Sequence, residues 1–164
     1  MDSIDWQIMD ALQVEGRATL TSLAKQVGLS VPAVTERVRK LEEDGVIDGI
    51  VARVDPRAAG YGVTALIGIT VLQPSKARFT KLLEGIPEVL ECYHVTGADS
   101  YVMKLVATTV EHLEQLIARI NIYGETRTSI VMSTTIAARP LRKPSPEPVI
   151  RHRGRSRATD PDAP

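Results

Sequence analysis

Apolar residues in the first fifty positions recur at the spacing of three short amphipathic helices. Within each set they lie three or four residues apart, which places them on one helix face. The three sets are Ile4, Ile8, Ala11 and Leu12, then Leu20, Leu23, Ala24 and Val27, then Val31, Val34, Val38 and Leu41. Gly28 is expected to end the second helix, and Ser30 to cap the third. A short helix, a turn with glycine and a longer helix are typical of a helix-turn-helix.

The segment after Gly45 is expected to form a small β-hairpin across residues 46–54. Its Asp48-Gly49 pair is a strong turn signal between apolar residues. Such a hairpin would be the wing of a winged helix-turn-helix, with Arg53 as a phosphate contact.

The face of the third helix opposite its apolar set carries polar and charged residues. Its N-terminal part would meet base edges in the major groove, and its cations would meet phosphates or guanine edges. The residues predicted to contact DNA are Ser30, Pro32, Ala33, Glu36, Arg37, Arg39, Lys40 and Arg53. The alternative is a solvated helix face, on which the cations pair with Glu36, Glu42 and Glu43.

Strand-like and helix-like stretches alternate in the second half of the chain. Strands are predicted at 63–72, 89–96, 101–108 and 126–136, with helices beginning at Pro74 and spanning 110–123. The order β-α-β-β-α-β is that of a ferredoxin-like domain, an antiparallel sheet with two helices on one face. The expected fold class is therefore α+β, an N-terminal winged helix-turn-helix followed by a C-terminal ferredoxin-like domain.

The first of these strands is apolar on both faces. Ala65 and Ile67 alternate with Leu66, so apolar side chains point toward the helices and away from them. An exposed apolar sheet face usually marks an interface. The pattern therefore predicts self-association through the sheet.

Composition suggests how the 164 residues are divided. We expect a DNA-binding domain at 1–55, a linker at 56–62, a ligand-binding and oligomerisation domain at 63–138, and a tail at 139–164. The tail is rich in proline and poor in large apolar residues, so it is expected to be disordered. It holds seven Lys and Arg against three Asp and Glu, whereas the whole chain holds 20 of each. A basic tail adds salt-sensitive DNA affinity; a solvated extension without function is the alternative.

Several functional classes lack their sequence signals. Cys92 is the only cysteine, which suits a reducing cytoplasm, and it is expected to be a buried small hydrophobe. His94, His112 and His152 have no metal-ligand spacing, and no phosphate-binding glycine loop or activated nucleophile is present. No secretion signal or membrane span is evident. We therefore expect a protein of the cytoplasm and nucleoid that is not an enzyme, with no cofactor and no membrane partner.

The two halves together resemble the Lrp/AsnC (feast/famine) transcriptional regulators over about residues 3–138. In the helix-turn-helix, the resemblance lies in Leu23-Ala24, Val27-Gly28-Leu29-Ser30, Val34, Arg37-Val38, Leu41-Glu42 and Gly45-Val46-Ile47. In the second half it lies in Gly85-Ile86-Pro87-Glu88-Val89 and Val95-Thr96-Gly97. The resemblance implies a bacterial or archaeal regulator that binds double-stranded DNA. It also implies a homodimer formed through the sheets, with a tetramer or octamer as larger assemblies.

The resemblance further implies an amino-acid effector bound between dimers and lined by the loop after the second strand. The corresponding residues are Thr96, Gly97, Ala98, Asp99 and Ser100. Many members carry an aspartate immediately before an aromatic residue here. In this chain Ser100 precedes Tyr101 and the acidic residue is Asp99, which leaves open a different effector, or none. The alternative for the loop is a simple polar turn.

The sequence leaves three functions to consider. The first is a sequence-specific regulator that responds to a small effector, an amino acid by the resemblance. The second is an architectural protein that wraps DNA with weak sequence preference; footprint length and sequence competition separate it from the first. The third, a metabolic enzyme on the ferredoxin-like domain, is disfavoured because no catalytic constellation is present.

Overall fold

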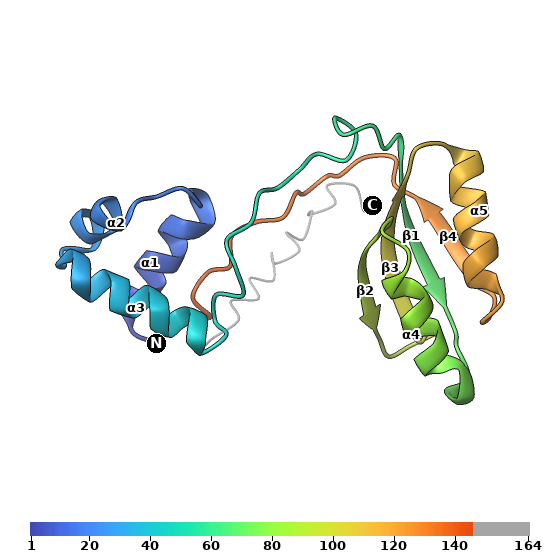
Figure 1. Cartoon of the computed structure of the whole chain (residues 1–164), viewed down its shortest axis with the longest axis horizontal. Helices are drawn as coiled ribbons and strands as arrows, with labels where there is room; N and C mark the ends of the chain where they lie inside the picture. The colour runs from blue at the N-terminus through green and yellow to red at the C-terminus, as the bar shows by residue number, and fades with distance from the viewer. Residues whose placement is uncertain (146–164) are drawn as a thin grey trace, which may run out of the picture. The chain divides into compact units, whose positions relative to one another are not determined.

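The computed structural model describes residues 1–145, so the disorder expected of 146–164 lies outside the described residues. The chain forms two compact units. One comprises Met1–Ile50 together with the segment that starts at Pro140, and the other comprises Val51–Arg139 (Figure 1). The domain boundaries expected at residues 55, 62 and 138 stay predictions.

Three helices make up the first unit, and side-chain caps define where they begin. The helices are α1 (Ser3–Val14), α2 (Leu20–Val27) and α3 (Val31–Glu43). Asp2 forms a capping box with Asp5, and the Thr19 hydroxyl accepts the N–H of Ser22. As predicted, Ser30 caps α3, and Gly28 ends α2 in the left-handed conformation with φ 70°.

The core of this unit is small and comes from all three helices. It consists of Ile8, Met9, Leu23, Ala24, Val34 and Leu41. Each of these residues belongs to a predicted apolar set except Met9, which extends the first. Small Ala24, 4% exposed, lets the helices approach closely.

The segment after α3 differs from expectation. Residues 46–55 contain no strand, so the prediction of a hairpin across 46–54 is wrong for this single chain. Val51 and Val54 are 82% and 71% exposed, so these apolar side chains are not buried against another element. A two-stranded ribbon whose apolar side chains stay exposed is marginally stable in water.

The second unit has the predicted β-α-β-β-α-β order and the ferredoxin-like arrangement. Its elements are β1 (Val63–Ile69), the 3-10 turn η1 (Gln73–Ser75), α4 (Lys76–Glu84), β2 (Val89–His94), β3 (Tyr101–Ala107), α5 (Val110–Asn121) and β4 (Thr126–Ile130). The sheet is antiparallel in the order β2-β3-β1-β4. The α+β fold class is therefore confirmed.

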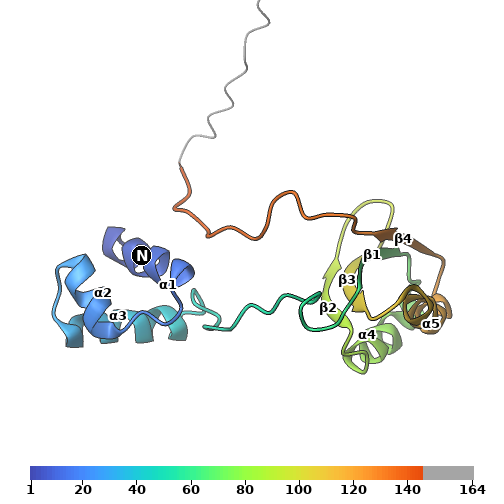
Figure 2. The same cartoon turned by 90° about the horizontal axis from the view of Figure 1, so that it is seen from above.

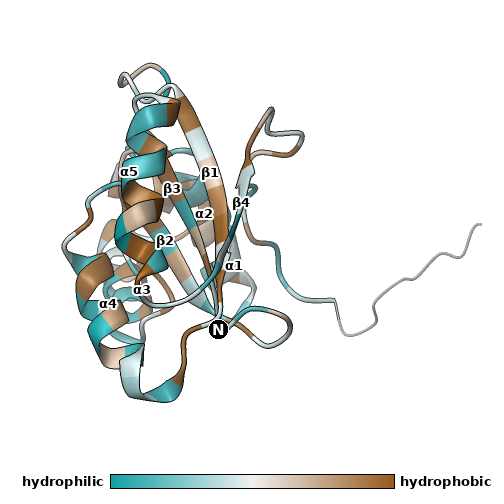
Figure 3. Ribbon diagram, turned by 90° about the vertical axis from the view of Figure 1, so that its right-hand side faces the viewer, coloured by the Kyte–Doolittle hydropathy of each residue, from teal (hydrophilic) through white to brown (hydrophobic). Residues whose placement is uncertain are grey.

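Both helices of this unit cover the same face of the sheet (Figures 2 and 3). The buried residues of this layer are Ala65, Ile67, Ile69, Val71, Phe79, Leu83, Ile86, Met103, Leu105, Ala107, Leu113, Leu116 and Ile120. Phe79 lies at the centre, with its ring 5.1 Å from Tyr101 and 5.7 Å from Tyr123. The alternate residues of each strand point to the other face, which carries no helix.

All four strands are shorter than predicted, and β1 and β4 differ the most, for separate reasons. β1 ends at Ile69, whose carbonyl accepts the N–H of Ser100, while the Thr70 hydroxyl donates to Ala98. β4 ends at Ile130 because its partner β1 begins at Val63. The Val131 N–H still donates to the Thr64 carbonyl, and residues after Val131 have no strand to pair with. Strand ends depend on the partner strand, which the apolar pattern does not reveal.

Candidate DNA-binding helix and effector loop

The structure places seven of the eight predicted DNA-binding residues together on α3 and its cap. Six are side chains of α3 and Ser30 precedes it: the set is Ser30, Pro32, Ala33, Glu36, Arg37, Arg39 and Lys40. The eighth, Arg53, belongs to the second unit, where its guanidinium donates to the Ala138 carbonyl at 3.4 Å. The candidate interface is therefore one helix with a defined beginning.

Arg37 contacts the start of α1. Its Nη1 lies 2.8 Å from an oxygen of Asp2 and 2.6 Å from an oxygen of Asp5. The hydrogen bonds to Asp5 and then to Asp2 raise the pKa of Arg37. The pKa of Asp2 is lowered, first by the backbone N–H of Asp5 and then by Arg37. In this structure Arg37 joins two helices of the fold.

Arg39 is paired within its own helix. It forms ion pairs with Glu36 and Glu43, and its Nε donates to Glu36 at 3.0 Å. Hydrogen bonding to Arg39 lowers the pKa of Glu36. These are two of the pairings expected of a solvated helix face. Lys40 is exposed and has no ion pair within residues 1–145.

The net charge of the helix-turn-helix is negative. Residues 1–50 contain nine Asp and Glu against five Lys and Arg. Since Arg37 and Arg39 pair with carboxylates, the cations of this segment left for phosphates are Arg17, Lys25 and Lys40. Phosphate contacts supply much of a protein's affinity for DNA. Residues 1–50 by themselves therefore have few cations with which to hold a duplex through its phosphates.

The predicted effector loop connects β2 to β3 and is fixed by backbone bonds. The Val95 N–H donates to the Ser100 carbonyl at 2.9 Å, and the Ser100 N–H donates to Ile69 at 3.0 Å. Thr96, Gly97 and Ala98 are exposed, whereas Asp99 and Ser100 are half-buried. The loop is thus an ordered turn that exposes its first three residues.

An ion pair between Asp99 and Arg127 connects this loop to β4. The Asp99 side chain is only 19% exposed and pairs with Arg127 of β4. The Asp99 carboxylate lies over Gly68. A Cβ atom added to Gly68 would be 2.4 Å from Oδ2 of Asp99. Sequence reasoning missed Arg127. Its signal was the alternation of β4, in which Arg127 stands opposite Gly68 in the register.

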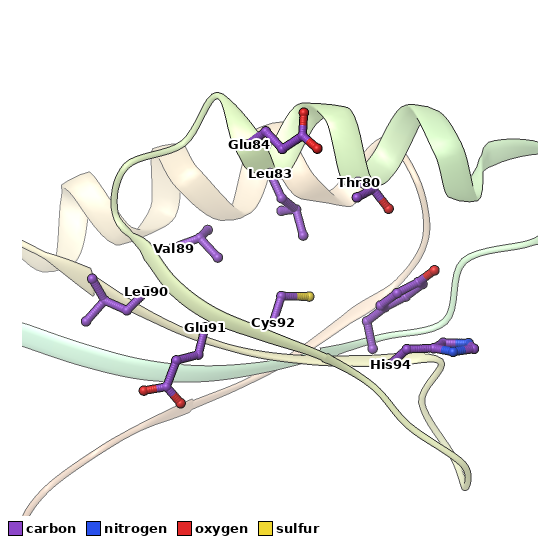
Figure 4. Close-up of a pocket in the computed structure, with 9 residues that line it drawn as sticks. Thr80, Leu83, Glu84, Val89, Leu90, Glu91, Cys92 and His94 are labelled. Atoms are coloured by element: carbon purple, nitrogen blue, oxygen red, sulfur yellow. The ribbon is translucent and has the colours of Figure 1, made fainter. Parts of the chain in front are cut away.

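A cavity of about 330 Å³ lies between α4 and β2 (Figure 4). Leu83 and Val89 line it together with Cys92, which is exposed. The prediction that Cys92 is buried is wrong, because β2 is an edge strand. Partial burial of its sulfur nevertheless raises the pKa of the thiol, which disfavours the reactive thiolate.

The sheet face without helices combines apolar and polar side chains. Leu66 and Tyr93 are 44% and 55% exposed. The Tyr93 hydroxyl donates to Glu91, and Lys104 lies 3.5 Å from Glu91. The prediction that apolar side chains point to both faces of β1 is confirmed, since Ala65 and Ile67 are buried while Leu66 is exposed.

Two other features are absent from the part of the chain that the structure describes. No group of three His, Cys, Asp or Glu residues there could hold a metal ion. Over the same residues, no helix has the length and apolar character needed to span a membrane.

The comparison with protein families matches both units. A winged helix-turn-helix DNA-binding family matches residues 1–48, and the Lrp/AsnC ligand binding domain matches residues 64–141. The transcriptional regulator LrpA of Mycobacterium tuberculosis is 42% identical over 137 residues, covering 82% of this chain and 91% of that protein. LrpC of Bacillus subtilis is 32% identical, covering 81% of this chain and 92% of that protein.

Solved structures give the same result. The structure of B. subtilis LrpC has a TM-score of 0.80 at 31% identity and covers 84% of this chain and 99% of that one. A feast or famine regulatory protein of M. tuberculosis, complexed with L-methionine, has a TM-score of 0.78 at 41% identity, covering 84% and 96%. With a matching domain order, matching family profiles and relatives above 30% identity, this chain belongs to the Lrp/AsnC family of DNA-binding transcriptional regulators.

Proposed function

We propose that this protein is a sequence-specific transcriptional regulator whose DNA binding responds to an amino acid. The observation that carries the proposal is α3, a helix capped by Ser30 whose outer face presents Pro32, Glu36 and Lys40 to solvent. Recognition helices meet base edges with their N-terminal residues, which is where this face begins.

The residues of α3 divide into those proposed to contact DNA and one that positions the helix. Ala33 suits contact with a thymine methyl. Glu36 and Arg39 pair with each other in this structure; if they separate on binding, they suit a cytosine amino group and a guanine. Lys40 would contact a phosphate. Arg37 is reassigned: its bonds to Asp2 and Asp5 make it a positioning residue that orients α3 against α1.

We further propose that two copies pair through the sheet face that carries Leu66 and Tyr93. Their exposure, beside the polar group of Glu91 and Lys104, supports an interface with an apolar centre and a polar edge. A dimer would place two α3 helices in successive major grooves of a pseudo-palindromic site. Larger assemblies, a tetramer or octamer, would extend this arrangement.

The proposed effector site is the loop of Thr96, Gly97, Ala98, Asp99 and Ser100, together with Arg127. The L-methionine complex of the M. tuberculosis relative supports an amino acid as ligand. Asp99 and Arg127 have the charges that pair with the ammonium and carboxylate of an amino acid. Exchange of the internal ion pair for the ligand's charges would shift the population of assemblies and so the DNA spacing that can be spanned.

The test is sequencing of genomic DNA bound by the purified protein, with and without an amino-acid mixture. We expect a few enriched sites that share a short inverted repeat and change with amino acids. Calorimetric titration with single amino acids should give heat with the wild type and much less with Asp99→Asn. Glu125→Gln, an exposed carboxylate change outside the loop, is the matched control.

Two results would contradict the proposal in different ways. Absence of heat with any amino acid would remove the effector and leave the loop as a polar turn. Broad enrichment without a motif would favour the architectural alternative, in which the protein wraps DNA.

A further inference from the structure

The segment that follows Arg139 is bonded to the end of α1. The Gln13 amide Nε2 donates to the Leu141 carbonyl at 3.0 Å, and its Oε1 accepts the Leu141 N–H at 2.7 Å. One side chain thus satisfies both backbone groups of a residue 128 positions away. We call this pair of bonds the Gln13 clamp. Because it uses both groups, it fixes the direction as well as the position of the segment.

The clamp lies on the same side as the segment that follows α3. A Cβ atom on Gly16, just after α1, would lie 3.1 Å from the side chain of Ile50. The end of α1 is therefore adjacent to the chain that leaves the recognition helix, where a wing was expected. The clamp brings the C-terminal segment to that side of the helix-turn-helix.

Positive charge begins immediately after the clamp. Arg142 and Lys143 follow Leu141, are exposed, and have no ion pair within the described 145 residues. In the sequence, four more arginines alternate with other residues across 151–157. The match to the Lrp/AsnC ligand binding domain ends at 141, so all these cations lie beyond it. These positive charges are opposite in sign to the net charge of residues 1–50.

We propose that Arg142 and Lys143 form a second DNA-binding element, which the Gln13 clamp holds against the helix-turn-helix. It supplies the phosphate contacts that the acidic helix-turn-helix lacks, while α3 supplies the base contacts. The clamp orders the start of the segment before DNA binds, which lowers the entropy cost of each contact. The inference rests on the proposed DNA-binding function.

The first experiment measures the salt dependence of DNA binding by the full chain. Fluorescence anisotropy is followed between about 50 and 200 mM salt, on a selected duplex and on an unrelated duplex of equal length. The variant Arg142→Gln/Lys143→Gln should lower the slope of log K against log salt by about 1.8, at about 0.9 for each phosphate contact. The loss should be similar on both duplexes. The control Lys81→Gln/Arg119→Gln removes two exposed charges from α4 and α5 and should leave the slope unchanged.

The second experiment removes the clamp without changing charge. Gln13→Ala should make the Leu141 amide exchange quickly with solvent and should weaken DNA binding about fivefold at fixed salt, as the bonds that order the segment are lost. Gln115→Ala, an exposed glutamine of α5, is the control. Unfolding of the first unit should be the same for the wild type and Gln13→Ala. If Gln13→Ala leaves the exchange rate of the Leu141 amide or the DNA affinity unchanged, the proposed role of the clamp is wrong.

The outcomes separate this inference from the function on which it rests. A wild-type protein that binds no duplex overturns both. A wild type that binds selected sites, with a slope equal to that of Arg142→Gln/Lys143→Gln, overturns the second element alone. Tighter binding by that variant would also overturn it, because the segment would then neutralise the acidic helix-turn-helix and compete with DNA.

Discussion

The two units of this protein are stabilised in different ways. The first has six buried core residues and relies on side-chain caps and on ion pairs between and along its helices. The second has thirteen buried core residues between a sheet and two helices. Burial of apolar surface is the dominant stabilising term in folding. The second unit should therefore be the more stable one, and α3 should depend more on local bonds.

The same contrast applies to charge. In the first unit Arg37 connects α3 to α1, and in the second Arg127 holds the loop that contains Asp99. Both arginines are engaged with carboxylates of their own unit, so neither is free for a ligand in this structure. A cation that a sequence motif assigns to binding can thus serve the fold, and only its partners distinguish the two roles.

The largest expected effect is in the core of the sheet domain. Phe79→Ala should cost about 3–5 kcal/mol, because the ring lies between Tyr101 and Tyr123 and the change leaves a cavity. Urea unfolding, followed by circular dichroism at one fixed protein concentration, measures the loss. With separate cores, the transition of residues 1–50 should stay in place. A shift of both transitions by the same amount would contradict the division into two units.

Matched cap removals compare the two units directly. Ser30→Ala and Thr109→Ala each delete a hydroxyl that accepts a backbone N–H at the start of a helix, α3 in one unit and α5 in the other. Each should cost about 1 kcal/mol. Only Ser30→Ala should also weaken DNA binding, since it loosens the end of α3 that meets the bases. Equal loss of DNA binding in both variants would show that α3 is not the recognition element.

The sequence predicted the ends of helices better than the ends of strands, for a physical reason. Caps such as Ser30 and stop signals such as Gly28 act over a few residues, so the local sequence contains them. The ends of β1 and β4 depend on partner strands far along the chain. The predicted ends of these two strands were therefore several residues too late. The prediction of a hairpin across 46–54 was wrong because a turn signal alone does not stabilise two strands whose apolar side chains stay exposed.

The candidate sites follow the same rule. The predicted residues of α3 lie on one helix, as their spacing indicated, and their contact with DNA stays a prediction. The partners of Arg37 were not foreseen, since Asp2 and Asp5 lie more than thirty residues away. Arg127 was missed because its position opposite Gly68 depends on sheet register. Residue type and local period indicate which side chains are exposed, and only tertiary structure shows which are already paired.

A smaller effect tests the ion pair of the effector loop. Gly68→Ala would place a Cβ atom against the Asp99 carboxylate and displace it from Arg127. Because Arg127 is largely exposed, the cost in stability should be below about 1 kcal/mol. Amino-acid binding should change more than stability does, as both charges become available to the ligand. Calorimetry on Gly68→Ala and the wild type measures this. Identical titrations would mean that the ion pair of Asp99 and Arg127 has no part in effector binding.

The smallest effect is the pH dependence contributed by Asp2. Its pKa lies below the ordinary value of 3.8 in the folded state, because the Asp5 N–H and Arg37 favour the carboxylate. A carboxyl group with a lowered pKa adds stability that is complete above its ordinary value and is lost as pH falls through the lowered one. Asp2→Asn keeps a capping side chain but has no charge to titrate. The wild type should therefore exceed Asp2→Asn in stability of the first unit at pH 7, and the difference should shrink toward pH 3. Urea midpoints of that transition measure it; a difference that is the same at both pH values would mean that Asp2 acts through its cap alone, and that Arg37 orients α3 through Asp5.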